Sequence, residues 1–199
     1  MRLFLGACAA ALTAVAVAGC VTATPGHDLN ADSVRALRVE RVVVAVDPAA
    51  NITWPTLAQE LIDARKARGG AAMDPGAEMR EMKTAVLSRL NEKARAVLEP
   101  PLRSTLSGTK PVIARVTVHR LSIPSTAGVL VGGESAMALS VDFVDARTEG
   151  PILSYPKANV TTPGGYKINM GTSGLFSHDP VERMFADLDG KLRPWLLKS

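Results

Sequence analysis

The chain has 199 residues, which is enough for one ordinary domain with a real core. Hydrophobic residues make up 47% and charged residues 21%, which are globular values and exclude wholesale disorder. The net charge of +4 is spread along the chain and is not interleaved with the scarce aromatic residues, so no nucleic-acid-binding surface is expected.

The first residues have the pattern of an export signal. Arg2 precedes an uncharged, alanine-rich run over residues 3–18, which is somewhat short for a membrane-spanning helix of roughly 20 apolar residues. The run ends in Val17-Ala18-Gly19-Cys20, which resembles the bacterial lipobox. The resemblance implies that residues 1–19 are a signal peptide and that Cys20 becomes a lipid-bearing N-terminus. The alternative is a soluble exported protein with a chance cysteine at its cleavage site.

The use of cysteine supports lipidation. Cys8 leaves with the signal peptide, so the mature chain has no thiol besides Cys20. Disulfides, cysteine catalysis and cysteine–zinc sites are therefore excluded from the mature domain. Several acyl chains, palmitate among them, would anchor the protein stably where one chain would not. Val21 follows the cysteine and favours the periplasmic side of the outer membrane, with the inner membrane as the alternative.

The first half of the mature chain predicts a tether, a strand and two helices. Residues 20–37 form the expected flexible tether, in which the polar, turn-rich residues 21–36 reach about 50 to 60 Å. The valine run at residues 39–46 predicts a central strand, buried on both faces. A capping box at residues 56–59 opens a helix that ends at Gly69-Gly70.

The second helix begins at Asp74-Pro75 and ends at Pro100-Pro101. Its apolar residues recur at steps of three and four and predict one buried stripe. The stripe consists of Met79, Met82, Val86, Leu90, Ala94 and Val97.

The second half predicts three strands and a last helix. Residues 111–123 and 135–146 alternate between apolar and polar, and residues 151–162 form a third strand. Pro156 favours an edge position or a bulge for that third strand. Asp179-Pro180 opens an amphipathic helix. The sequence therefore predicts an α+β domain over residues 38–199, an antiparallel sheet of about four strands with helices packed on one face.

Chemical motifs are weak. His27, His119 and His178 have neither the spacing nor the neighbours of metal ligands, and no metal or cofactor is expected. Ser154 and Lys157 match the Ser-x-x-Lys pattern of penicillin-binding enzymes. That pattern needs a helix, whereas a strand would put the two side chains on opposite faces. We expect no catalytic residue.

The segment over residues 162–180 is the candidate partner-contact loop. It combines glycines with apolar side chains, and long loops in compact domains are usually functional or disordered. The alternative is that these side chains fold back onto the sheet. They are Tyr166, Ile168, Met170, Leu175 and Phe176.

The stretch over residues 111–153 resembles small proteobacterial envelope lipoproteins of unknown function, in which a strand ends in a Val-x-Asp-Ala-x-Thr-Gly-like turn. Residues 145–150 match that turn, except that Glu149 is inserted before Gly150. More distantly, the layout is similar to the β-α-β-β-α auxiliary lipoproteins of lipid-transport, secretion-pore and peptidoglycan-synthase systems. The resemblance implies a membrane-anchored, non-catalytic accessory module that binds an envelope protein. The alternatives are a lipid or small-molecule carrier and, third, an envelope hydrolase.

Overall fold

The computed structural model describes residues 27–70, 74–125, 127–128, 132–162 and 179–198. Its helices and strands occur in the order α1 (Ala31–Arg35), β1 (Leu37–Thr53), α2 (Pro55–Ala67), α3 (Pro75–Val97), α4 (Glu99–Thr105), β2 (Lys110–Ser122), β3 (Ser135–Asp145), β4 (Pro151–Thr162) and α6 (Pro180–Leu197). Within these ranges, no helix has both the length and the apolar character that a bilayer crossing requires.

The four strands form one mixed sheet in the order β1-β2-β3-β4. The pairs β2/β3 and β3/β4 are antiparallel, which confirms the α+β class and the meander of the last three strands. The expectation of an antiparallel sheet is wrong for β1, which pairs with β2 in parallel, for example Val44 beside Val116. The reason is the connection: helices intervene between these strands, and such a crossover returns the chain in the same direction.

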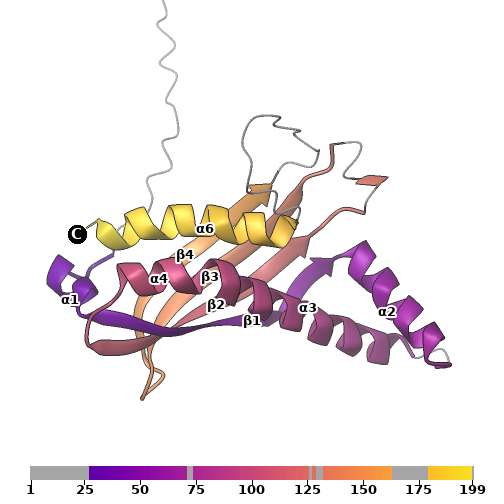
Figure 1. Cartoon of the computed structure of the whole chain (residues 1–199), viewed down its shortest axis with the longest axis horizontal. Helices are drawn as coiled ribbons and strands as arrows, with labels where there is room; N and C mark the ends of the chain where they lie inside the picture. The colour runs from indigo at the N-terminus through magenta and orange to yellow at the C-terminus, as the bar shows by residue number, and fades with distance from the viewer. Residues whose placement is uncertain (1–26, 71–73, 126, 129–131, 163–178, 199) are drawn as a thin grey trace, which may run out of the picture.

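Helices α3, α4 and α6 cover one face of the sheet, and none of the described helices lies on the opposite face (Figure 1). Strand residues alternate accordingly, with the apolar set under the helices and the other set facing outward. Leu90 on α3 and Val116 on β2 both have no exposed surface, as the periodicity predicted. The largest fully buried side chains include Trp195, Phe143 and Phe185.

Strand β1 lies at an edge of the sheet, so its predicted central position is wrong. Val39, Val42 and Val44 are nevertheless buried, because α3 and α4 pack against β1, whereas Val43 and Val46 are half-buried. Asn91 accepts a hydrogen bond from the Val44 N–H at 2.9 Å and donates to the Val44 carbonyl at 3.3 Å. Glu99 accepts from the Val42 N–H at 3.1 Å. Side chains thus occupy the hydrogen-bonding groups that another strand would use.

Three details of the helices differ from expectation. The predicted capping box is wrong, because Trp54 is the N-cap of α2 and Pro55 occupies the first turn, where a missing N–H does no harm. Pro100-Pro101 does not end helical structure, since the same tolerance lets both prolines open α4. Met79 is 56% exposed and lies outside the predicted stripe, of which Val86, Leu90 and Ala94 are buried while Met82 and Val97 are half-buried against the core.

The predicted tether over residues 20–37 contains ordered structure at its C-terminal end. Residues 31–35 form α1, in which Val34 is buried, and Leu37 begins β1. His27 packs edge-on against Trp195 of α6, with ring centroids 5.1 Å apart, and Trp195 packs edge-on against Tyr155 of β4. The described chain is therefore attached to the domain from His27 onward.

Candidate functional site

Most of the residues for which the sequence predicts a functional role lie outside the residues that the structure describes. Cys20, the candidate contact loop with Tyr166, Ile168, Met170, Leu175 and Phe176, and His178 all fall there. Lipidation of Cys20 and partner contact by the loop therefore stay predictions. In the part of the chain that the structure describes, no group of three or more His, Cys, Asp or Glu side chains is arranged to hold a metal ion.

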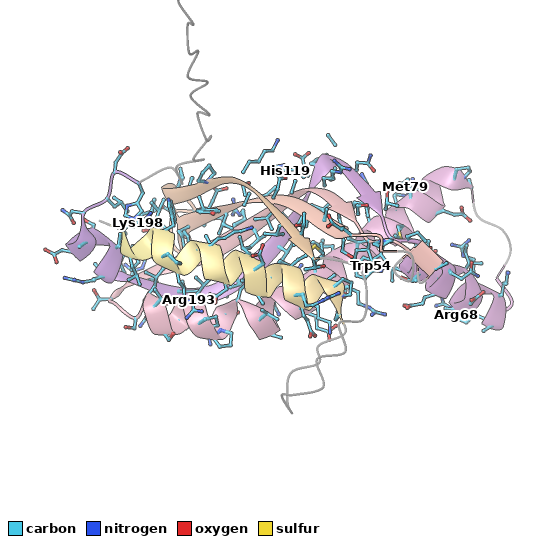
Figure 2. All side chains as sticks on the ribbon, turned by 90° about the horizontal axis from the view of Figure 1, so that it is seen from above. Trp54, Arg68, Met79, His119, Arg193 and Lys198 are labelled. Carbon is cyan, nitrogen blue, oxygen red and sulfur yellow. The ribbon has the colours of Figure 1, made fainter. Side chains whose placement is uncertain are left out.

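One polar cluster, not predicted from the sequence, lies on the helix-free face of the sheet. Asp47 of β1, His119 of β2 and Ser140 of β3 form a hydrogen-bonded chain. The Asp47 carboxylate lies 3.0 Å from His119 Nδ1, and His119 Nε2 lies 3.0 Å from the Ser140 hydroxyl. Figure 2 shows His119 on the side of the sheet away from α6. The Ala49 N–H also donates to Asp47, and these hydrogen bonds, led by that of Ala49, lower the pKa of the Asp47 carboxyl.

The cluster has the order of groups found in serine hydrolases: carboxylate, imidazole and hydroxyl. With Nδ1 protonated, the ring donates to Asp47 and accepts from Ser140, which is the tautomer a general base needs. A hydrolase also needs converging oxyanion donors and a pocket that excludes water. Ser140 instead lies mid-strand, opposite Thr117 of β2, and the Asp47 side chain is 34% exposed. The simpler role of the cluster is structural: its hydrogen bonds link β1, β2 and β3 on the face of the sheet that the described helices do not cover.

No local motif signals this cluster, because its members are 72 and 21 residues apart. The one available signal was the polar face of the strand that carries His119. Pairing of His119 with Asp47 depends on the parallel β1/β2 register, which the sequence pattern did not predict.

Ser154 and Lys157 are both exposed, so the expectation that a strand places them on opposite faces is wrong. A register shift between Leu139 and Val141 of β3 interrupts the alternation of β4 at this point. The Ser154 hydroxyl donates to Asp142 at 2.6 Å and is thereby engaged away from a lysine base.

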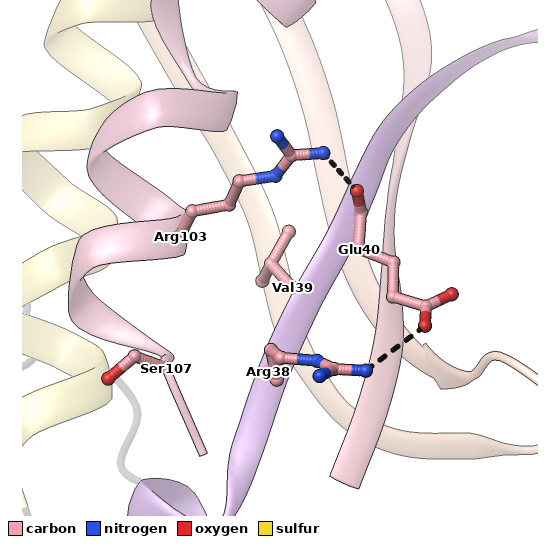
Figure 3. Close-up of a pocket in the computed structure, with 5 residues that line it drawn as sticks. All are labelled: Arg38, Val39, Glu40, Arg103 and Ser107. Atoms are coloured by element: carbon pink, nitrogen blue, oxygen red, sulfur yellow. Dashed lines mark hydrogen bonds and ion pairs between the residues drawn. The ribbon is translucent and has the colours of Figure 1, made fainter. Parts of the chain in front are cut away.

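A shallow pocket of about 490 Å³ lies between the start of β1 and α4. It is lined by Arg38, Val39, Glu40, Arg103 and Ser107 (Figure 3). Arg38 pairs with the Glu40 carboxylate at 3.4 Å, while Arg103 donates to the Glu40 carbonyl and pairs with Glu99 at 2.7 Å. Because carboxylates match both guanidinium groups, the pocket offers no surplus positive charge to an anion, and its contacts close the edge of β1.

Helix α2 and the N-terminal turns of α3 project beyond the sheet (Figure 1), and we call α2 together with residues 75–81 the arm. Of the 13 residues of α2, only Leu57 is buried. Ion pairs hold the arm together: Arg65 contacts Glu78 at 2.9 Å and Glu81 at 2.6 Å. These hydrogen bonds, with that of Glu78 first, raise the pKa of Arg65. The Gly69 backbone at φ +69° ends α2, as its sequence predicted.

Exposed apolar side chains gather at the two ends of the molecule. Among the described residues, the large ones are Ile62 at 37%, Met79 at 56% and Leu197 at 68% exposed. Ile62 and Met79 belong to the arm, whereas Leu197 ends α6 at the opposite end of the long axis, beside Lys198 (Figure 2). Helix α2 thus adds only Leu57 to the core and leaves Ile62 exposed, and Met79 of α3 is exposed in the same arm.

Comparisons with known proteins find distant similarity to solved structures. The chain is similar to a protein of Caulobacter crescentus assigned provisionally as a lipoprotein, with 15% identity, 56% of this chain and 86% of that chain covered, and a TM-score of 0.34. It is also similar to a lipoprotein of Neisseria meningitidis, with 13% identity, 82% and 98% covered, and a TM-score of 0.27. No family model and no curated protein matches the chain. At TM-scores below 0.5, these similarities carry no argument about fold or function.

Proposed function

We propose that this protein is a membrane-anchored, non-catalytic lipoprotein of the bacterial envelope that acts as an accessory interaction module. The anchor rests on the sequence Val17-Ala18-Gly19-Cys20 and on the absence of any other cysteine from the mature chain. With Val21 after the cysteine, the proposed location is the periplasmic side of the outer membrane.

The arm is the proposed binding surface for an envelope protein. The observation that carries this role is the exposure of Ile62 and Met79 on a projecting helix pair. The pair is braced by Arg65, whose side chain is only 14% exposed and contacts two glutamates. A helix pair that these ion pairs already hold in place binds a partner with little loss of conformational entropy.

A lipid carrier is less well supported. A carrier would need an apolar cavity between the sheet and its helices. Among the described residues, Val116, Leu139 and Phe185 point into that space and have no accessible surface. A water-sized probe therefore does not reach these side chains, and a lipid chain is much larger.

An envelope hydrolase is favoured by one observation, the chain Asp47–His119–Ser140. A serine-directed fluorophosphonate probe distinguishes this candidate from the proposed module. We expect no labelling of the purified protein. Labelling that disappears in Ser140→Ala but persists in Ser154→Ala would favour the hydrolase.

The interaction role is tested by site-specific photo-cross-linking in cells. A benzoylphenylalanine at the exposed Lys66 of the arm should form an adduct with another envelope protein, and one at the exposed Ala186 of α6 should not. The double change Ile62→Ser and Met79→Ser should abolish the Lys66 adduct and leave the melting temperature unchanged. Equal adducts at Lys66 and Ala186, or an adduct that survives the double change, would contradict the proposal.

A further inference from the structure

The position of His27 limits how far the domain can stand from the membrane. If Cys20 carries the lipid, as the proposed function requires, residues 20–26 are all that separates the anchor from His27. Even fully extended, seven residues reach only roughly 25 Å. His27 is held against Trp195, and Leu29 packs against the core. The reach is therefore about two fifths of what a free segment over residues 20–37 would give.

The short reach of residues 20–26 favours one end of the molecule, the end beside Trp195, as the part nearest to the membrane. Trp195 lies in the last turns of α6, and α1 contacts both α6 and β1. The arm lies at the opposite end of the long axis: Figure 2 shows Lys198 at one end and Arg68 with Met79 at the other. Helix α3 alone, with 23 residues, is roughly 35 Å long. A tether of roughly 25 Å thus cannot bring the arm to the bilayer as easily as the end beside Trp195.

The same end presents side chains that suit a bilayer surface. Leu197 is 68% exposed, and the next residue is the exposed Lys198. Arg35 of α1 is also exposed, and its side chain is 79% exposed in a 3.5 Å pair with Asp32. An ion pair so exposed contributes little, so the guanidinium is free to exchange its partner for a lipid phosphate. An exposed leucine next to a lysine, at the end of the molecule that also carries Arg35, matches the boundary between head groups and acyl chains.

We propose that the end formed by α1 and the C-terminus of α6 docks on the phospholipid surface in which Cys20 is anchored, with Leu197, Lys198 and Arg35 against the head groups. The acyl chains supply the affinity and this surface supplies the orientation. The arm then points away from the membrane, into the space where a soluble or opposite-membrane partner is met.

The test uses the acylated full-length mature protein in vesicles of phosphatidylethanolamine and phosphatidylglycerol. Because the mature chain has no other free thiol, Leu197→Cys and Met79→Cys each take one fluorescent label, and the two native side chains have comparable exposure, 68% and 56%. Lipids with a spin label on the head group should quench the label at 197 at least about twofold. They should leave the label at 79 unchanged.

The controls separate this proposal from the anchoring on which it rests. Intact mass first establishes whether each labelled protein carries lipid on Cys20; a protein without lipid contradicts the anchoring itself. With lipid present, equal quenching at the two positions, or stronger quenching at 79, would overturn the orientation. In the acylated protein, Leu197→Cys combined with Arg35→Glu should show weaker quenching at 197, because the head-group contact is then repelled.

Discussion

His27 packs edge-on against Trp195, with ring centroids 5.1 Å apart and ring planes at 81°. This contact attaches the first described residue to the last turns of the last helix, so the two ends of the domain lie together. Trp195 is in turn held by Tyr155 at 4.9 Å and is 1% exposed. The proposed anchor at Cys20 would be positioned relative to the domain by this small aromatic group.

Replacing His27 tests that attachment. His27→Ala should lower the free energy of unfolding by about 1 kcal/mol, which is typical of an aromatic pair, and should speed proteolytic cleavage before α1. Neither ring nitrogen of His27 has a hydrogen-bond partner among the described residues. His27→Phe should therefore be at least as stable as the natural protein. Urea melts and limited proteolysis measure both, and equal behaviour of the two variants would refute the attachment.

Leu90 tests the layer arrangement. It has no exposed surface and lies where α3 packs on the sheet, so Leu90→Ala should cost about 2–5 kcal/mol of stability. Met79→Ala, on the same helix but 56% exposed, should change stability by less than about 0.5 kcal/mol. Urea denaturation measures both changes. Similar losses in the two variants would show that α3 is not divided into a packed and a projecting part.

Asn91 tests how the edge of the sheet is protected. Asn91→Ala removes the side chain that binds both the N–H and the carbonyl of Val44. The loss should be about 1–3 kcal/mol, because these backbone groups are partly buried, and the exposed edge should promote aggregation. Glu92→Ala, at an exposed position of the same helix, is the matched control and should be neutral. Melting curves and light scattering during storage decide between these outcomes.

A feature of this fold could be predicted from the sequence when it depends on interactions between residues that are close together in the chain. Periodicity correctly placed Val86, Leu90 and Ala94 in the core, since a residue's face on a helix depends on its neighbours alone. The same periodicity failed for Met79, because α3 continues beyond the sheet and has no core to contact there. Local capping signals also succeeded at Asp74 and Asp179, whose side chains accept hydrogen bonds from the first turns of α3 and α6.

The features that were not predicted depend on contacts between residues that are far apart in the sequence. A valine run predicts burial but not what causes it, and β1 is covered by side chains of α3 and α4 from 47 and 57 residues away. The cluster of Asp47, His119 and Ser140 likewise depends on a parallel strand pair that no local pattern specifies. Pro100-Pro101 was ambiguous, because proline both ends a helix and opens one.

Asp47 predicts a pH dependence of stability. Hydrogen bonds from Ala49 and His119 lower its pKa in the folded protein, so the unfolded state binds this proton more readily. The resulting stability is fully present above the ordinary pKa of 3.8 and is lost as the pH falls through the lower, folded value. As the pH is lowered from 5 into the acid range, the Asp47→Asn variant should therefore lose less stability than the natural protein. Equal acid losses in urea melts of the two proteins would contradict the role of this hydrogen bonding.

The central claim, that the domain is attached to the envelope by lipid on Cys20, is tested most directly by intact-mass measurement of the mature protein purified from bacterial membranes. We expect a chain that begins at Cys20 and carries the added mass of a diacylglyceryl group, with or without a further acyl chain on its amine. Cys20→Ala should leave the signal peptide attached. An unmodified mature chain, or one that begins at another residue, would contradict the account.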